Sequence, residues 1–229
     1  MSVPTPLLDV FKRGEADRDA RLLAAQGGLA PRAQEQLALL VFLLGDPDAE
    51  VRAAADSTLN SIPNEVLSAA LARSDTADST REYFANRGVM PIAGGAEGPD
   101  DPLVDPEPAI PEPDGPLDET ARESLTQQIA KMNFTQRLRA AVKGTREMRS
   151  VLIRDPNKMI AASVLSSPKL TESEVAAFSR MANVGEDILR IIATNRAWLK
   201  NYGVVVGLTK NPKTPLGLSL NLMARLNDR

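Results

Sequence analysis

Residues 148–153 read MRSVLI and residues 189–194 read LRIIAT, so similar residues recur 41 positions apart. Further on, KMIAASVLSSPK at 158–169 is matched by YGVVVGLTKNPK at 202–213, 44 positions apart. A period near 40 with helical patterning is typical of helical repeat arrays. We therefore expect an all-α fold of the helical-repeat solenoid type, with three helices in each repeat. The expected helices are residues 145–153, 157–166 and 171–182, then 185–194, 197–209 and 214–226.

The amino-acid composition favours helices and leaves few groups for catalysis. Hydrophobic residues make up 43% of the 229 residues and aromatic residues only 3%, and small or straight apolar side chains suit packed helices better than strands. The chain has no cysteine and no histidine. This composition excludes disulfides, Ser-His-Asp and Cys-His catalysis and His-ligated haem, and it removes most zinc sites. We expect a protein that is not an enzyme and has no metal or other cofactor.

No stretch of the sequence has the length of a membrane-spanning helix. The longest apolar run, residues 37–44, has eight residues, whereas a span needs about 18. The N-terminus lacks a basic region followed by a long apolar stretch, so no signal peptide is predicted. Together with the absence of cysteine, these features favour a location in the cytoplasm, without membrane insertion.

The charges divide the chain into three parts. Residues 1–90 carry nine Lys/Arg and thirteen Asp/Glu, residues 91–120 carry no base and nine acids, and residues 121–229 carry eighteen bases and eight acids. The net charges are therefore −4, −9 and +10. We expect an N-terminal helical domain at 1–90, a linker at 91–120 and a basic C-terminal helical-repeat domain at 121–229.

Residues 46–63 resemble a HEAT repeat or the related leucine-rich-repeat variant. In these families an Asp-Pro turn leads to a Val-Arg pair, then to small residues and leucine, and DPDAEVRAAA at 46–55 follows that order. The resemblance implies stacked helical hairpins and indicates architecture rather than activity. The preceding segment, residues 31–44, is apolar on nearly all sides and predicts a central buried helix, with Pro31 in its first turn. Asp46 is expected to cap the next helix, with Pro47 at its first position.

The C-terminal half resembles an uncharacterised bacterial group of leucine-rich-repeat-variant/HEAT-like proteins across nearly its whole length. The residues that carry the resemblance are 143–144, 154–158, 167–171, 195–202 and 211–215. The resemblance implies a helical repeat and brings no activity with it.

Several local signals define helix ends and contacts in this half. Thr135 is expected to cap a helix over residues 136–143. Thr171 and Glu174 have the spacing of a capping box. Gly203 and Gly207, four residues apart, predict close packing of one helix against another.

The stretch 91–120 holds eight prolines among its acids and has too few apolar residues to compensate the entropy of ordering. It predicts a disordered acidic linker. One interpretation is a solvated spacer. The other is a tether that folds back on the basic C-terminal half and competes with an anionic ligand.

Three arginines occupy similar repeat positions: Arg52, Arg149 and Arg190. They could contact an anion along a groove. Alternatively, each could bond a turn or an acid of a neighbouring repeat, and we favour this second interpretation because stacking requires the same contact in every unit.

The candidate site residues lie near the repeat turns of the basic half. Lysine side chains near helix N-termini can hold phosphates, although a solvated face is the simpler explanation of such lysines. Trp198 is the only tryptophan, and it could anchor a partner or fill a junction between helices. The candidate partner-binding residues are Lys158, Lys169, Trp198, Lys200, Tyr202, Lys210 and Lys213.

The sequence favours a non-catalytic interaction scaffold that binds a protein or peptide partner on a helical-repeat surface. The alternative is binding of nucleic acid or ribonucleoprotein by the basic C-terminal domain, although aromatic residues for stacking on bases are few. A third hypothesis, a hydrolase or a DNA glycosylase of the HEAT-like fold, lacks a catalytic aspartate that can be placed.

Overall fold

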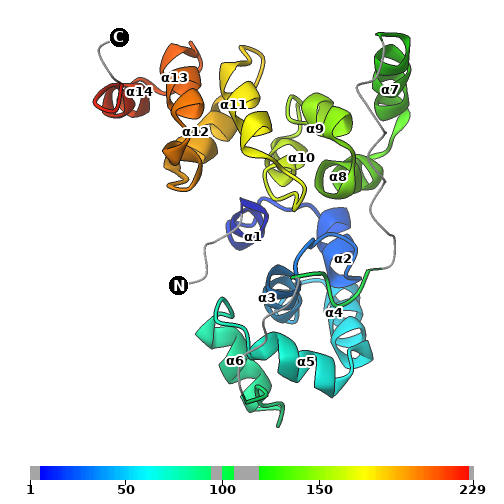
Figure 1. Ribbon diagram of the computed structural model, residues 1–229. Coiled ribbons are helices and arrows are strands. Elements are labelled where there is room, and N and C mark those ends of the chain that lie inside the picture. Colours follow the sequence, from blue (N-terminus) through cyan, green and yellow to red (C-terminus); the bar gives the residue numbers. More distant parts are fainter. Residues whose placement is uncertain (1–5, 94–99, 106–118, 227–229) are drawn as a thin grey trace. The chain divides into compact units, whose positions relative to one another are not determined.

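The computed structural model describes residues 6–93, 100–105 and 119–226. Within these residues every regular element is a helix, with fourteen α-helices and one short 3-10 helix, so the chain is all-α as expected (Figure 1). The chain divides into two compact units, an N-terminal unit of residues 1–109 and a C-terminal unit of residues 110–229. In the described part of the chain, no helix combines the length and the apolar character needed to cross a membrane.

The N-terminal unit is built around α3. Leu37, Leu40 and Leu43 of this helix are fully buried, and α1, α2, α4 and α6 all pack against it. This confirms the central buried helix, which begins at Ala33 rather than in a turn led by Pro31. The helices of this unit are α1 (Pro6–Lys12), α2 (Arg18–Ala25), α3 (Ala33–Leu43), α4 (Ala49–Ser61), α5 (Asn64–Leu71) and α6 (Asp78–Ala85).

The C-terminal unit contains the helices expected from the doubled sequence. The stretch with three consecutive valines, residues 204–206, lies in helix α13. The elements are α7 (Glu119–Lys131), α8 (Phe134–Lys143), α9 (Arg146–Leu152), α10 (Lys158–Val164), α11 (Glu172–Arg180), α12 (Glu186–Thr194), η1 (Trp198–Lys200), α13 (Tyr202–Lys210) and α14 (Leu216–Met223).

Three groups of three helices share one local design, and we call them helix triplets: α2–α4, α8–α10 and α11–α13. In each triplet the first and third helices pack together. The residue that precedes the first helix of a triplet accepts, with its side chain, a hydrogen bond from the N–H of the third residue of that helix. The residue that precedes the third helix accepts a hydrogen bond from the N–H of the second residue of its helix. The first caps are Asp17, Asn133 and Thr171, and the second caps are Asp48, Asn157 and Asn201.

The caps correct three expectations. Asp48, not Asp46, caps α4, because Asp46 is buried and its Oδ1 accepts the Asp48 N–H at 2.9 Å. Asn133, not Thr135, caps α8 and forms a capping box with Gln136. The helix expected over 197–209 is broken, since Asn201 is extended and ends η1 before it caps α13. The capping box of Thr171 and Glu174 is confirmed.

The glycines of α13 allow its close approach to α11, as expected. A Cβ added to Gly207 would lie 2.0 Å from Ser179 Oγ and 3.0 Å from Ser179 Cβ. At one end Asn201 Nδ2 donates to Glu172, and at the other Asn211 Nδ2 donates to the Ser179 carbonyl at 2.9 Å. The two helices are therefore parallel.

The described part of the expected linker packs on the N-terminal unit. Leu103 and Val104 form backbone hydrogen bonds with the side chain of Gln36 in α3. The other predicted linker residues, 94–99 and 106–118, lie outside the described residues, so the prediction of a tether that folds back on the basic C-terminal half stays a prediction. The contact with Gln36 proves to be the most specific polar arrangement of the N-terminal unit.

Candidate functional site

The predicted partner-binding residues do not form one cluster. Trp198, Lys200 and Tyr202 lie in η1 and at the N-terminal end of α13, whereas Lys210 and Lys213 lie at its C-terminal end. Nine helical residues separate the two ends by about 13 Å. Tyr202 is 51% exposed and Trp198 is half-buried, so the tyrosine presents the more open aromatic face.

The two remaining lysines already have structural contacts. Lys158 begins α10, and its Nζ lies 2.7 Å from Asp187 Oδ2 in α12. Both side chains are exposed, so this ion pair is worth at most about 1 kcal/mol. Lys169 follows α10, and its backbone carbonyl accepts a hydrogen bond from Arg149 at 3.3 Å.

The largest exposed apolar side chains of the C-terminal unit lie on α14. Leu216, Leu220 and Met223 are 75%, 56% and 53% exposed, and their spacing of four and three residues places them on one face of the helix. Leu222 is buried, and Ser219 Oγ donates to the Thr209 carbonyl of α13 at 3.3 Å. The helix therefore packs on α13 with one side and exposes a second apolar side.

Basic residues accompany this apolar face. Lys210 and Lys213 precede α14 and Arg225 follows it, all exposed and without an ion pair to any described residue. The helix itself carries no charged residue. The sequence predicted a helix over 214–226 and pointed to Lys210 and Lys213, but it did not show that α14 has an exposed apolar side, because leucines at every second position from 216 to 222 read equally well as a buried helix.

The three repeat arginines have different environments. Arg149 is 2% exposed and pairs with Glu174, with 2.8 Å between Nε and Oε1, and its Nη1 donates to the Gly144 carbonyl. Arg52 donates to the carbonyls of the preceding turn. Arg190 forms only an exposed pair with Glu186 in its own helix. Arg149 and Arg52 thus have structural contacts, while Arg190 makes no contact with another helix.

The pKa of Glu174 reflects this environment. Burial alone raises the pKa, but the hydrogen bonds from Arg149 and Thr171 more than offset it, so the pKa lies below its ordinary value. Glu174 is therefore ionised at neutral pH and joins two helices: it lies in α11, bonds the α11 cap residue Thr171 and pairs with Arg149 of α9.

A second candidate site surrounds Gln36 in the N-terminal unit. Gln36 is 1% exposed, and its amide makes four hydrogen bonds. Its Nε2 donates to the carbonyls of Gly27 at 3.0 Å and Val104 at 2.6 Å, and its Oε1 accepts the N–H groups of Leu103 at 2.8 Å and Val104 at 3.0 Å. One buried side chain thus binds the backbone of residues 103–104, where the chain bends.

Sequence reasoning missed this site, although a signal was present. Gln34, Glu35 and Gln36 are consecutive polar residues in the first turn of a helix that is apolar from Leu37 onward. A buried polar side chain needs hydrogen-bond partners. The sequence does not show that the partner lies 68 residues further on.

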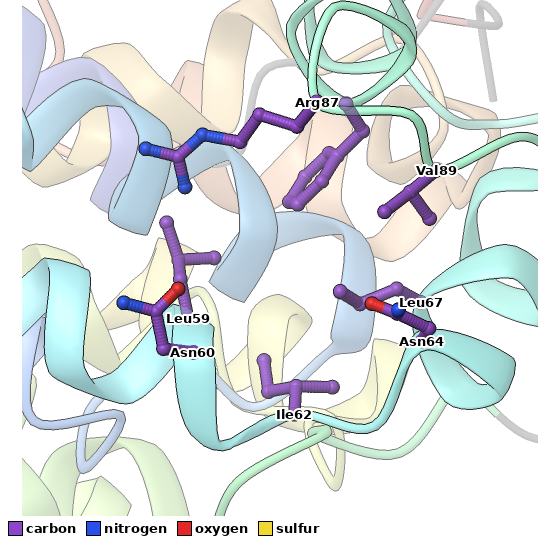
Figure 2. A pocket seen from close by; sticks show the side chains of 8 residues that line it. Leu59, Asn60, Ile62, Asn64, Leu67, Arg87 and Val89 are labelled. Carbon is purple, nitrogen blue, oxygen red and sulfur yellow. The ribbon is translucent and has the colours of Figure 1, made fainter.

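A pocket of about 190 Å³ lies between α4, α5 and the end of α6. Figure 2 shows the Arg87 guanidinium on the same side of the pocket as the Asn60 amide, with Ile62 and Val89 among the apolar walls. Arg87 is 3.6 Å from Asp56 and 4.7 Å from the centre of the Tyr83 ring. Pockets for small ligands usually exceed about 300 Å³. The size and the paired arginine make this pocket a weak candidate for a metabolite site.

Among the residues described, no three acidic side chains gather in a way that could hold a metal ion. No protein-family model, no curated protein and no solved structure matches the chain. Its function is therefore argued from the geometry of the α14 face.

Proposed function

We propose that the protein is a non-catalytic interaction scaffold that binds a protein partner on a helical-repeat surface. The observation that carries the proposal is the exposed apolar face of α14, formed by Leu216, Leu220 and Met223. A surface helix of a globular protein normally exposes polar residues on the side that faces water. A contiguous apolar face is typical of a surface that a partner covers.

The helix triplets support an array of the armadillo/HEAT-like kind. Triplets α8–α10 and α11–α13 follow one another, and their caps Asn157 and Asn201 are 44 residues apart, as in the doubled sequence. The resemblance to HEAT-like repeat proteins and the location in the cytoplasm stay predictions.

The charges around α14 indicate the chemistry of the partner. Lys210 and Lys213 precede and Arg225 follows in the chain a helix that carries no charge, so we expect the complementary surface to be an amphipathic helix with apolar residues at its centre and acidic residues at its rim. Rim charges mainly set the association rate and its salt dependence, while the apolar centre supplies most of the affinity.

A photo-crosslinking amino acid at position 220 tests the proposal in the full chain. We expect it to capture a protein partner in the source cell, and the triple variant Leu216→Ser, Leu220→Ser, Met223→Ser to lose at least about 90% of the complex, since burial of each side chain contributes about 1.5–3 kcal/mol. The variant Thr126→Ser on α7 serves as the control. Capture that survives the triple variant would contradict a role of α14.

Nucleic-acid binding is the alternative, and the charge of +10 on residues 121–229 favours it. Binding through phosphates falls steeply with salt, with a slope of about −0.9 per phosphate contact on duplex DNA. Titration of the full chain with labelled duplex DNA and single-stranded RNA between 50 and 200 mM salt distinguishes the two functions. Absence of binding at the lower salt concentration rules the alternative out.

A further inference from the structure

The α14 face takes up the first, fifth and eighth positions of its helix. The residues at the same three positions of α11 are Glu172, Ala176 and Ser179. Each of them meets α13. Asn201, the cap of α13, donates its Nδ2 to Glu172 at 3.3 Å. A Cβ added to Gly203 would lie 3.8 Å from Ala176 Cβ, and one added to Gly207 would lie 2.0 Å from the Oγ of the serine. In α11 these three positions therefore form the docking face for a parallel helix.

The N-terminal unit uses the first of these positions in the same way. Arg18 is the first residue of α2, and its Nε lies 2.7 Å from the Oδ2 of Asp48, which caps α4. The two helices pack together, as α11 and α13 do. In both triplets the first residue of the first helix thus meets the cap of the third helix, so the N-terminal ends of the two helices lie side by side.

The inward side of α14 also matches that of α11. In α11 the third, fourth and seventh residues are buried. In α14 the seventh residue, Leu222, is buried, and the third and fourth, Leu218 and Ser219, are half-buried. A Pro-Lys pair precedes both helices, at 168–169 and 212–213. α14 therefore has the pattern of the first helix of a triplet, and its exposed side is the one on which a third helix docks.

The side chains of the α14 face are larger than those that α11 presents. In the three triplets the eighth residue of the first helix is small: Ala25, Ala141 and Ser179. The sixth residue of the third helix is small as well: Ala54, Ser163 and Gly207. α14 has Met223 at its eighth position and Leu220 in the place of Ala176. Because large side chains pack against small ones, a helix that docks on α14 has to supply the space itself.

We propose that the partner on the α14 face is a single helix of another protein that lies parallel to α14, as α13 lies on α11. It has an Asp or Asn cap beside Leu216 and small residues at its second and sixth positions, where α13 has Gly203 and Gly207. This inference rests on the proposed function and specifies its partner. The third helices of the described triplets, α4, α10 and α13, are already packed on their own first helices, so a second copy of the chain has none of them to offer.

The test uses the full chain and, as the probe, a fluorescein-labelled peptide with the sequence of residues 201–213, NYGVVVGLTKNPK. A hydrocarbon staple between its positions 205 and 209, on the side away from the glycines, keeps this short peptide helical, because short helices are marginal in water. Fluorescence anisotropy should show binding to the wild type, and the triple variant of α14 should bind at least about tenfold more weakly. Absence of binding at about 1 mM protein would overturn the proposal.

An exchange of large and small residues tests the register. In the peptide, Gly207→Leu should reduce affinity for the wild type at least about tenfold, because the new side chain would meet Met223. The protein variant Met223→Ala should bind this altered peptide at least about fivefold more tightly than the wild type does, and the original peptide more weakly. Met90→Ala, at an exposed methionine of the N-terminal unit, is the matched control and should change neither affinity.

A nitroxide at the N-terminus of the peptide reports the direction of the docked helix. It should broaden the amide signal of Gly217 more strongly than that of Ala224, which lies about 10 Å further along the helix. Stronger broadening at Ala224, or full affinity of the Gly207→Leu peptide, would overturn the parallel helix, while loss of binding in the triple variant would still support α14 as the contact surface. Self-association of the full chain that the triple variant abolishes would assign the face to a second copy and overturn the proposal.

Discussion

At the scale of residues, Arg149 and Arg190 show that arginines at equivalent positions of two repeats can have different structural roles. Both follow a similar apolar pattern 41 residues apart, yet Arg149 is buried against Glu174 and Arg190 is exposed. The difference arises from the α-helix that comes two further along the chain. For Arg149 in α9 this is α11, which supplies Glu174, whereas for Arg190 in α12 it is α14, which carries no charge.

Replacement of these two arginines should therefore have unequal effects. Arg149→Ala leaves Glu174 buried without its partner, and loss of one member of a buried pair costs about 3–5 kcal/mol. Arg190→Ala should change the free energy of unfolding by at most about 0.5 kcal/mol, because its pair is exposed. Urea denaturation of both variants measures the difference. Similar effects of the two substitutions would contradict a structural role of the buried pair.

At the scale of elements, the sequence predicted well where helices lie, but it predicted poorly which distant residues contact each other. Capping residues act on the nearest backbone, so Thr171 and Glu174 could be predicted. Asp46 was assigned to the wrong role because its contact is made with Arg21, from another helix. The same reason explains why the site of Gln36 was missed, since its partner lies 68 residues away.

Close packing of α11 and α13 gives a prediction for single glycines. Gly207→Ala should destabilise the protein by about 1–3 kcal/mol, because the new methyl group would overlap Ser179, which is fully buried. Gly217→Ala in α14 is the matched control. No atom lies within 4 Å of its added Cβ, and alanine favours helix by up to about 1 kcal/mol. Thermal unfolding should show opposite signs for the two variants.

At the scale of the whole molecule, each of the two units contains an ion pair of the same kind. In each, an arginine pairs with the aspartate of the Asp-Pro turn that precedes the third helix of a triplet. Arg21 lies 2.9 Å from Asp46 in the N-terminal unit, and Arg137 lies 2.7 Å from Asp155 in the C-terminal unit. Each arginine is the fourth residue of the first helix of its triplet. The two helices also share the order Arg-Leu-x-Ala-Ala, at residues 21–25 and 137–141, so this relation was present in the sequence and was missed because the repeat was sought only after residue 148.

Helix α11 and the docked residues 100–105 should respond to acid in opposite directions. The pKa of Glu174 is lowered, so its stabilisation of the C-terminal unit is present above its unfolded pKa and is lost as the pH falls through the folded pKa. The pKa of Asp100 is raised by burial, assisted by Asp75 and opposed by Arg73, by the Gln34 N–H and by Arg32. Docking of residues 100–105 is therefore strongest below the ordinary aspartate pKa and weakens as the pH rises through the raised one.

Hydrogen exchange between pH 7 and pH 4, corrected for the intrinsic rate, measures both responses. Protection of the Leu103 and Val104 amides should increase on acidification, and that of α11 should decrease. Asp100→Asn should remove the first response and Glu174→Gln the second. A parallel loss of protection in both regions would contradict the assignment.

The separation of Gln36 from the segment that it binds also sets an order of events during synthesis. The ribosome adds about 5–20 residues per second, so the 68 residues between Gln36 and Val104 take roughly 3–14 s. During this interval the helices of the N-terminal unit can form while the Gln36 amide still lacks its backbone partner. Docking of residues 100–105 on Gln36 is therefore a late step in the assembly of the N-terminal unit.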